Sequence, residues 1–286
     1  MELRKIRQSM KSLFITTIIC LLTLTHAIGQ SADSIAHAMF AKTKSLKTVT
    51  YTMTKYERID GVLQKQIAAV KLQKEPFKVY SKQIEPDEGL EVLYIGGNKT
   101  ALINPNGFPW FNVKLSPTGS RMTKGQHHTI LDSGFDTFIA ILEFLFDKYK
   151  MNIHEISSLT SETIDGKAYW KLDFNNPNFK ILEYTVKPKE DILKIANERF
   201  ISSFMILELN PDIEDFEDVS AGDVIKIPND YSPRMTLFID KKLMVPSEII
   251  VEDKIGIYER YNFTNIKLNP KIKPEEFTPD YEDYGF

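Results

Sequence analysis

The sequence offers almost no sulfur chemistry. Only one of its 286 residues is a cysteine, Cys20, so the chain cannot form an intramolecular disulfide. It contains neither a His-Glu-x-x-His motif nor a Gly-x-Ser-x-Gly elbow. The usual signatures of a zinc protease and of a serine hydrolase are therefore missing, and the part of the chain after Cys20 has no thiol nucleophile.

The sequence also lacks an excess of positive charge. Its 36 basic and 39 acidic residues give a net charge of −3 and a pI near 6.0, which does not indicate a nucleic-acid partner. Gly96-Gly97 is typical of a hairpin turn, not of a phosphate-binding loop, and the sequence predicts no cofactor.

Candidate metal ligands are few and scattered. His127 and His128 are the one adjacent pair, and neighbouring residues on a strand point to opposite faces, so the pair is not expected to bind one ion. We interpret both as polar residues of a turn before a helix. His37 and His154 have no companions, and the carboxylates lie in acidic runs typical of solvated loops. The sequence therefore singles out neither a metal site nor a catalytic residue.

The N-terminus has the layout of a secretory signal peptide over residues 1–29. Basic residues precede an apolar stretch from Leu13 to Leu24, and Ala27-Ile28-Gly29 resembles a cleavage site. The apolar stretch is shorter than the roughly 20 residues that span a bilayer. Cys20 lies inside it and is not preceded by the small residues of a lipoprotein signal, so lipidation is not expected.

Short alternating segments dominate the rest of the chain. Val49 to Ile59 alternates apolar and polar residues, and Asp60-Gly61 is a hairpin signal. Further strand patterns follow about every 8–12 residues up to Leu115, and they resume at Thr163 and again from Met235 to Ile266. This spacing predicts an antiparallel meander and an α+β fold.

Two helices interrupt this pattern, one from Ser31 to Leu46 and a stronger one from Gly134 to Tyr149. Ser133 and Asp136 resemble a capping box at the start of the second helix. Its apolar residues cover so much of its circumference that several sides must be buried. Either a helix across the concave face of a curved sheet or an ordinary core helix fits this pattern. The residues that would face an apolar cavity are Phe135, Phe138, Ile139, Leu142, Leu145 and Phe146.

A segment with a different period lies between two strand regions. Tyr184-Thr185-Val186 reads as a strand, residues 191–200 and 204–209 as two helices, and Val224 to Ile227 as a second strand. The opening Tyr-x-Val, the central Asn210-Pro211 and the closing Ile225-Lys226-Ile227-Pro228 resemble the LysM module. This resemblance implies a βααβ module, residues 181–231, that binds N-acetylglucosamine-containing glycan of peptidoglycan.

The LysM resemblance also implies where the glycan would lie. The family's groove runs between the first strand-to-helix turn and the loop after the second helix. One departure affects this site: Lys189-Glu190-Asp191 stands where LysM modules usually have Gly-Asp-Thr. A glycan-binding module and a spacer that has lost the sugar therefore both remain open. The matching groove positions are Pro188, Lys189, Glu190, Asp191, Ile192, Asn210, Pro211, Asp212 and Ile213.

The flanking regions, residues 30–180 and 232–286, resemble a bacterial envelope family of unknown function with the LolA-like lipoprotein-carrier fold. This resemblance is carried by Glu91-Val92-Leu93-Tyr94, by Leu115 to Gly119 with Arg121, by His128-Thr129-Ile130 and by the ending Tyr261-Asn262-Phe263. It implies an incomplete β-barrel wrapped around helices, with an apolar cavity that holds lipid or lipoprotein acyl chains in some relatives.

These observations predict a non-enzymatic protein exported to the periplasm or cell envelope of a Gram-negative bacterium. It would bind peptidoglycan through the inserted module and acyl chains in the cavity. The alternative is a cell-wall-remodelling enzyme, or an accessory of one, that the module directs to the wall.

Overall fold

The computed structural model describes residues 30–286, so the predicted signal peptide and Cys20 lie outside the described residues. The helices and strands of this range are, in order, α2 (Ala32–Lys44), β1 (Thr48–Ile59), β2 (Val62–Gln73), β3 (Lys78–Glu85), β4 (Glu91–Ile95), β5 (Ala101–Asn104), β6 (Val113–Leu115), α3 (Ser120–Thr123), the 3-10 turn η1 (Ile130–Asp132), α4 (Asp136–Lys148), α5 (Ile153–Ile156), β7 (Ser157–Ile164), β8 (Lys167–Asn175), β9 (Ile181–Thr185), α6 (Ile192–Arg199), α7 (Ser203–Leu209), β10 (Val224–Pro228), β11 (Arg234–Asp240), β12 (Pro246–Glu252), β13 (Ile257–Leu268) and the 3-10 turn η2 (Pro274–Phe277).

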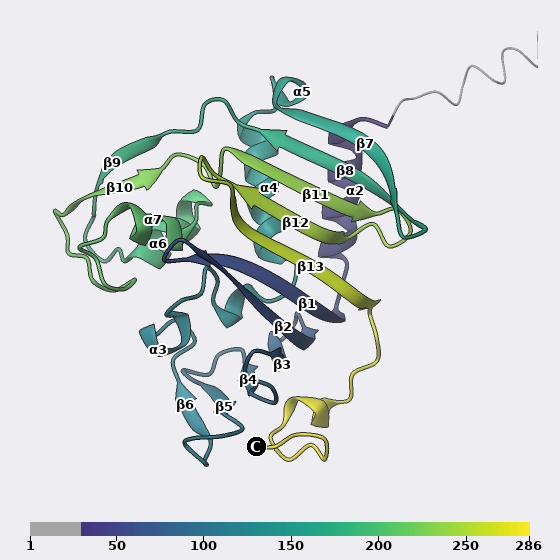
Figure 1. Cartoon of the computed structure of the whole chain (residues 1–286), viewed down its shortest axis with the longest axis vertical. Helices are drawn as coiled ribbons and strands as arrows, with labels where there is room; N and C mark the ends of the chain where they lie inside the picture. Colours follow the sequence, from purple (N-terminus) through teal and green to yellow (C-terminus); the bar gives the residue numbers. More distant parts are fainter. Residues whose placement is uncertain (1–29) are drawn as a thin grey trace, which may run out of the picture.

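Within residues 30–286, eleven strands form one open, curved antiparallel sheet (Figure 1). Their order is β6-β5-β4-β3-β2-β1-β13-β12-β11-β8-β7, so most neighbours in the sheet are also neighbours in the chain. The predicted meander and α+β class are confirmed. The two exceptions are the pair β11 and β8, which flank the segment of β9 to β10, and the central pair β1 and β13, which joins the first and last strands of the described residues.

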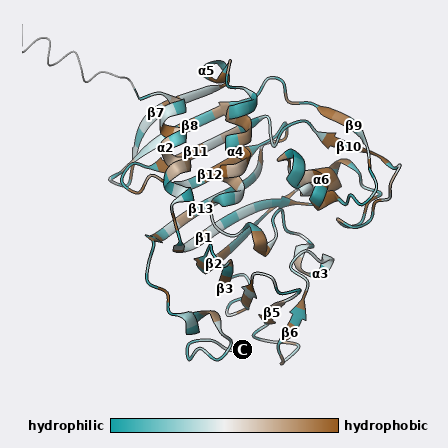
Figure 2. Cartoon of the chain, turned by 180° about the vertical axis from the view of Figure 1, so that it is seen from behind, coloured by the Kyte–Doolittle hydropathy of each residue, from teal (hydrophilic) through white to brown (hydrophobic). Residues whose placement is uncertain are grey.

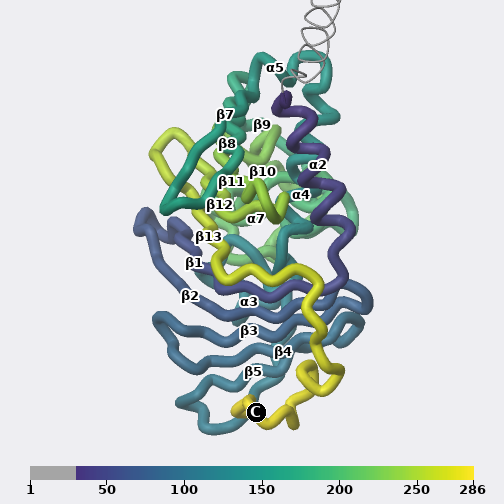
Figure 3. Tube along the Cα trace, turned by 90° about the vertical axis from the view of Figure 1, so that its right-hand side faces the viewer, coloured from purple at the N-terminus to yellow at the C-terminus, as the bar shows by residue number. Residues whose placement is uncertain are grey.

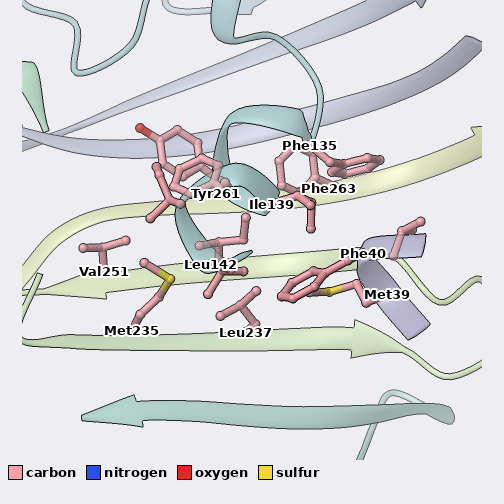
Figure 4. Packing of buried hydrophobic residues seen from close by; sticks show 14 of the residues in the cluster. Met39, Phe40, Phe135, Ile139, Leu142, Met235, Leu237, Val251, Tyr261 and Phe263 are labelled. Carbon is pink, nitrogen blue, oxygen red and sulfur yellow. The ribbon is translucent and has the colours of Figure 1, made fainter. Parts of the chain in front are cut away.

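Helices α2 and α4 lie across one face of the sheet, as Figure 2 shows from behind. Side chains from α4 meet strand residues such as Leu237 and Val251 in the main core (Figure 4). Phe146 packs edge-on against Phe40 of α2, and Phe144 stacks on Phe200 at 4.8 Å. The prediction that this helix is covered on several sides is confirmed.

The predicted capping box at the start of α4 is wrong. Ser133 donates its hydroxyl to the carbonyl of Ile130, and no side chain caps the helix. The box forms one turn earlier, where Thr129 and Asp132 cap η1. Asp132 also accepts a hydrogen bond from Thr137 and thereby ties the two turns together.

The segment between β8 and β11 forms a βααβ unit, which confirms the predicted order of its elements. Strands β9 and β10 pair only with each other among the described residues, in antiparallel register with Tyr184 opposite Ile225. The unit has a hydrophobic centre of its own, built around Ile192 and Ile206. Its two ends meet, because the amide of Asn229 donates to the carbonyl of Lys180.

The C-terminal segment passes beside β1 to β5 (yellow in Figure 3) and packs against the face of the sheet opposite α4. Tyr284 stacks on Tyr80 of β3 at 3.7 Å. The buried Glu91 accepts hydrogen bonds from Tyr80 and from the amide of Gly285. One face of β3 and β4 is thus covered by the tail, while the other is free to form a cavity. No helix in residues 30–286 has the length and apolar character needed to cross a membrane.

Candidate ligand cavity and its buried charge cluster

A cavity of about 370 Å³ lies between the concave face of the sheet and the segment from Arg121 to Gly134. Alternation along each strand decides which side chains face it, for example Ser81 on β3, while its neighbour Tyr80 faces the C-terminal tail. The full lining is Tyr51, Met53, Lys55, Glu57, Gln66, Ala68, Val70, Ser81, Gln83, Asp87, Leu90, Val92, Ile103, Leu115, Arg121, Met122, Gln126, His128, Thr129, Ile130, Asp132, Ser133, Gly134, Phe138, Tyr261 and Phe263.

Gly134 lets the covering segment approach the sheet closely. Its φ of +100° lies in the region that glycine adopts without strain. Its amide donates to the Tyr51 hydroxyl at 2.9 Å, and a Cβ at this position would lie 2.6 Å from Leu72. A larger residue here would push the segment away from the cavity.

The cavity changes from apolar to charged along β1. Its inward residues run from Tyr51 and Met53 to Lys55 and Glu57 toward the β1–β2 turn. The neighbouring strands follow the same gradient, since Met53 pairs with Ala68 and Phe263, whereas Lys55 pairs with Gln66 and Tyr261. The site is therefore amphipathic.

Two carboxylates stand directly opposite each other at the charged end. Glu57 and Glu259 are cross-strand partners on β1 and β13 and are only 2% and 0% exposed. Like charges in such a pair destabilise a sheet unless cations compensate them. Lys55 donates to Glu57 at 2.9 Å, and Tyr261 donates to Glu57 at 2.6 Å and to Glu259 at 3.1 Å.

The two adjacent histidines lie in a bend before η1, as the interpretation as turn residues before a helix predicts. They do not point to opposite faces, as they would on a strand, because both contact Glu259. Nδ1 of His127 lies 2.9 Å and Nε2 of His128 lies 3.4 Å from Oε2 of Glu259. They can converge because they lie in the irregular segment between α3 and η1, where strand alternation does not apply. Nε2 of His127 also lies 3.1 Å from the carbonyl oxygen of Arg58, which fixes its ring.

The carboxylates and His128 stabilise each other's charged forms. Burial alone would raise the pKa of Glu259, but the charge of His128 and hydrogen bonds from both histidines hold that pKa well below its usual value. Burial lowers the pKa of His128, yet the Glu259 carboxylate outweighs this effect and raises it to about 9. Burial also raises the pKa of Glu57, and Lys55 with His127 brings it below the usual value. Lys55 thus pairs with Glu57, and protonated His128 pairs with Glu259.

A second cavity of about 220 Å³ lies between the covering segment, α4 and the βααβ unit. It shares His128, Thr129 and Asp132 with the first cavity, so these residues form the wall between the two. Phe204 of α7 stacks on His127 at 4.4 Å, and Ser202 is hydrogen-bonded to Tyr258 at 3.0 Å. The βααβ unit is therefore packed against the charge cluster.

The structure places the predicted cavity helix differently from expectation. Only Phe138 of the six predicted side chains lines the 370 Å³ cavity. The others are packed against α2 and the neighbouring strands, because α4 fills the part of the concave face next to β8, β11 and β12. The five side chains that are buried in the core and do not line the cavity are those of Phe135, Ile139, Leu142, Leu145 and Phe146.

The predicted glycan residues lie on two neighbouring loops of the βααβ unit. Ile192 is buried in the hydrophobic centre of the unit and Ile213 packs against it. Asp191 caps α6, and Glu190 accepts hydrogen bonds from the Tyr184 hydroxyl and the amide of Lys187. The side-chain amide of Asn210 donates a hydrogen bond to the carbonyl of Lys226, and its side-chain oxygen accepts one from the backbone amide of Lys226. The exposed positions are Pro188, Lys189, Pro211 and Asp212.

Sequence reasoning missed Lys55, Glu57 and Glu259. A signal for the first two was present, because they continue the inward alternation of Val49, Tyr51 and Met53 and interrupt it with charges. A charged residue on the apolar face of a strand is unusual and indicates a buried partner. Nothing in the residues around Glu259 on β13 indicates that it is this partner.

One family matches part of the sequence. It is described as a protein of unknown function (DUF1571), and it matches residues 46–184, just under half of the chain. The matched range runs from β1 into β9 and so covers the strands that supply most of the cavity. No curated protein matches the sequence.

Several solved structures are similar to the chain at low sequence identity. The lipoprotein LppX from Mycobacterium tuberculosis has a TM-score of 0.41 and 12% identity, with 84% of this chain and 96% of that chain covered. LprF from Mycobacterium bovis has a TM-score of 0.40 and 13% identity, covering 85% and 94%. A LolA superfamily protein from Nitrosomonas europaea has a TM-score of 0.37 and 14% identity, covering 88% and 99%. The chain is thus similar to these proteins over most of its length, at 12–14% identity.

Proposed function

We propose that this protein is an exported envelope protein whose cavity holds one apolar chain of a lipid or of a lipoprotein. The observation that carries the proposal is the amphipathic lining of the cavity. Apolar side chains such as Met53, Val70 and Phe263 would surround the chain, while Lys55 and Gln126 would face its polar end.

The size of the cavity supports a single chain. Small-molecule sites commonly enclose about 300–1,000 Å³, and 370 Å³ lies near the lower end of that range. A two-chain lipid held completely inside would need more room. The charge cluster supports the proposal too, because each of its two buried carboxylates has a basic partner, Lys55 for Glu57 and His128 for Glu259.

Native mass spectrometry of the chain purified from a bacterial envelope fraction tests this function. We expect a bound species of lipid mass that organic solvent extracts, at one per chain. Cavity-lining Ala68→Phe should lose this species, since the larger ring occupies the apolar part. Protein that carries no lipid, both as purified and after incubation with fatty acid, would contradict the proposal.

We further propose that residues 181–231 are a LysM module that binds peptidoglycan, inserted into a host domain formed by residues 30–180 and 232–286. Support comes from the βααβ order, the separate hydrophobic centre and the meeting of the two ends. An insert whose ends meet disturbs its host little.

The turn that departs from the family motif gives more support. Lys189, at the position of the usual glycine, has a φ of +65°. This is the left-handed conformation that glycine favours, so the backbone keeps the glycine-type turn although the glycine is absent. Asp191, at the position of the usual threonine, caps α6.

Sedimentation with purified peptidoglycan tests the module. Wild-type chain should pellet with the glycan, and the paired change Lys189→Glu with Asp212→Lys on the two groove loops should weaken pelleting. Matched exposed changes outside the groove, Lys242→Glu with Asp147→Lys, should not. Equal pelleting of both double variants would contradict glycan binding here. Hydrolysis of the wall in a zymogram would instead favour the enzyme alternative.

A further inference from the structure

The loop between β5 and β6 exposes three aromatic side chains to solvent. Phe108 is 81% exposed, Trp110 84% and Phe111 68%, and the rings of Phe108 and Trp110 contact each other edge-on with centroids 5.2 Å apart. Single exposed apolar residues are common on protein surfaces. Three neighbouring aromatic rings on one loop form a concentrated apolar surface, and such surfaces mark interaction sites.

This loop also lies in the middle of an uncharged stretch. Residues 100–113 contain no acidic or basic side chain, although 26% of the whole chain is charged. Charged groups are costly to bring into a bilayer, whereas Trp and other aromatic rings favour its interface with water. A specific protein interface commonly surrounds its apolar centre with a polar rim. The composition of the loop fits the membrane interface better.

The loop stands at the charged end of the strands around the cavity. Asn106 in this loop donates a hydrogen bond of 2.9 Å to the carbonyl of Glu88 in the β3–β4 turn. The neighbours of Glu88 in that turn, Asp87 and Leu90, line the cavity. The β5–β6 pair lies at the bottom of Figure 1, far from α5 at the top.

The same ends of the strands carry further exposed apolar residues. Val62 and Leu63 lie at the β1–β2 turn, and Ile255 at the β12–β13 turn is 81% exposed. The antiparallel pairing of β1 with both β2 and β13 places these two turns at one end of the sheet.

We propose that Phe108, Trp110 and Phe111 insert into the interface of a lipid bilayer and hold this end of the cavity against the membrane surface. This contact does not depend on what the cavity binds, because the aromatic loop lies outside the cavity lining.

Binding to vesicles of phosphatidylethanolamine and phosphatidylglycerol tests the proposal. The chain from Gln30 onward is used, because the apolar stretch from Leu13 to Leu24 could bind vesicles itself and all described elements lie after it. Trp170→Phe leaves Trp110 as the one tryptophan of the chain. We expect the emission of Trp110 to shift to the blue on adding vesicles and the protein to sediment with them.

Loop variants decide whether these three rings are responsible. Each ring replaced by serine should weaken vesicle binding about tenfold, the effect of losing one large buried side chain. The triple variant F108S/W110S/F111S should not sediment, while Met151→Ser, which changes a side chain 81% exposed elsewhere, should bind as the wild type does. Circular dichroism and thermal unfolding verify that the variants are folded.

Two results would overturn the proposal. One is vesicle binding by the triple variant equal to that of the wild type. The other is that the wild type does not bind vesicles. If the loop then captures an envelope protein instead, the surface is assigned to a protein partner. If the triple variant loses vesicle binding but still carries lipid in its cavity, the membrane contact is separate from the cavity function.

Discussion

The hydroxyl of Tyr231 lies 3.1 Å from Nε2 of His128. Because the same hydroxyl donates its proton to Oε1 of Glu259 at 2.6 Å, it accepts the N–H of His128. Tyr231 is the last residue of the βααβ unit, after β10, whereas His128 lines the cavity. A single buried hydroxyl thus connects the unit, the charge cluster and the cavity wall.

Removal of this hydroxyl should destabilise the fold. We expect Tyr231→Phe to lower the free energy of unfolding by about 1–3 kcal/mol, since it leaves buried polar partners unsatisfied. Tyr94→Phe is the matched control, because the Tyr94 hydroxyl makes one bond of 3.2 Å to the carbonyl of Asn98 at a less buried site. Urea denaturation measures both variants. Equal effects of the two changes would contradict the role of Tyr231.

Stability should fall as the pH rises above neutrality. The folded-state pKa of His128, about 9, lies above the ordinary value of 6.5. Its contribution is therefore complete below pH 6.5 and is lost between pH 6.5 and 9, with a size of up to about 3 kcal/mol. Glu259 acts in the opposite direction, because its lowered pKa makes its contribution disappear only in acid.

Urea denaturation at pH 6.5 and 9.5 measures this dependence. His128→Asn should remove most of the difference between the two pH values, although Glu57, Asp132 and Glu259 still face the site. The exposed His37 provides the control, since His37→Asn should keep the difference. If His128→Asn retains the full pH dependence, another group must titrate.

The turn at Lys189 should gain stability from glycine. Lys189→Gly relieves the left-handed backbone at φ +65° and should raise the free energy of unfolding by roughly 0.5–1 kcal/mol. Lys187→Gly, two residues earlier at an exposed position without positive φ, should lower it instead because glycine loses more backbone entropy on folding. Thermal unfolding compares the two. A destabilising Lys189→Gly would show that its side chain matters more than the turn.

The elements that depend on local pattern could be predicted from the sequence. Residues close together in the sequence determine the helical period of α4, the hairpin turns and the order of the βααβ elements. The structure confirms these predictions. The charge cluster could not be predicted in this way. Glu57 and Glu259 meet because β1 pairs with β13, and this pairing joins distant parts of the chain.

The histidines and the cavity helix show the same limit. His127 and His128 converge on Glu259 because the segment before η1 is irregular, and a strand would have separated them. The apolar pattern of α4 predicts burial but not the neighbour that buries it. Most of that face packs against α2 and the sheet, so only Phe138 reaches the cavity.

Fluorescence titration with a dansyl-labelled undecanoic acid tests the central claim, that the cavity binds an apolar chain, most directly. Ala68 faces the cavity and Ala69, the next residue, faces the other side of β2. We predict that Ala68→Phe raises the dissociation constant at least about tenfold, whereas Ala69→Phe leaves it close to the wild-type value. Equal affinity of the wild type and both variants would contradict the account, because the probe would then bind outside the cavity.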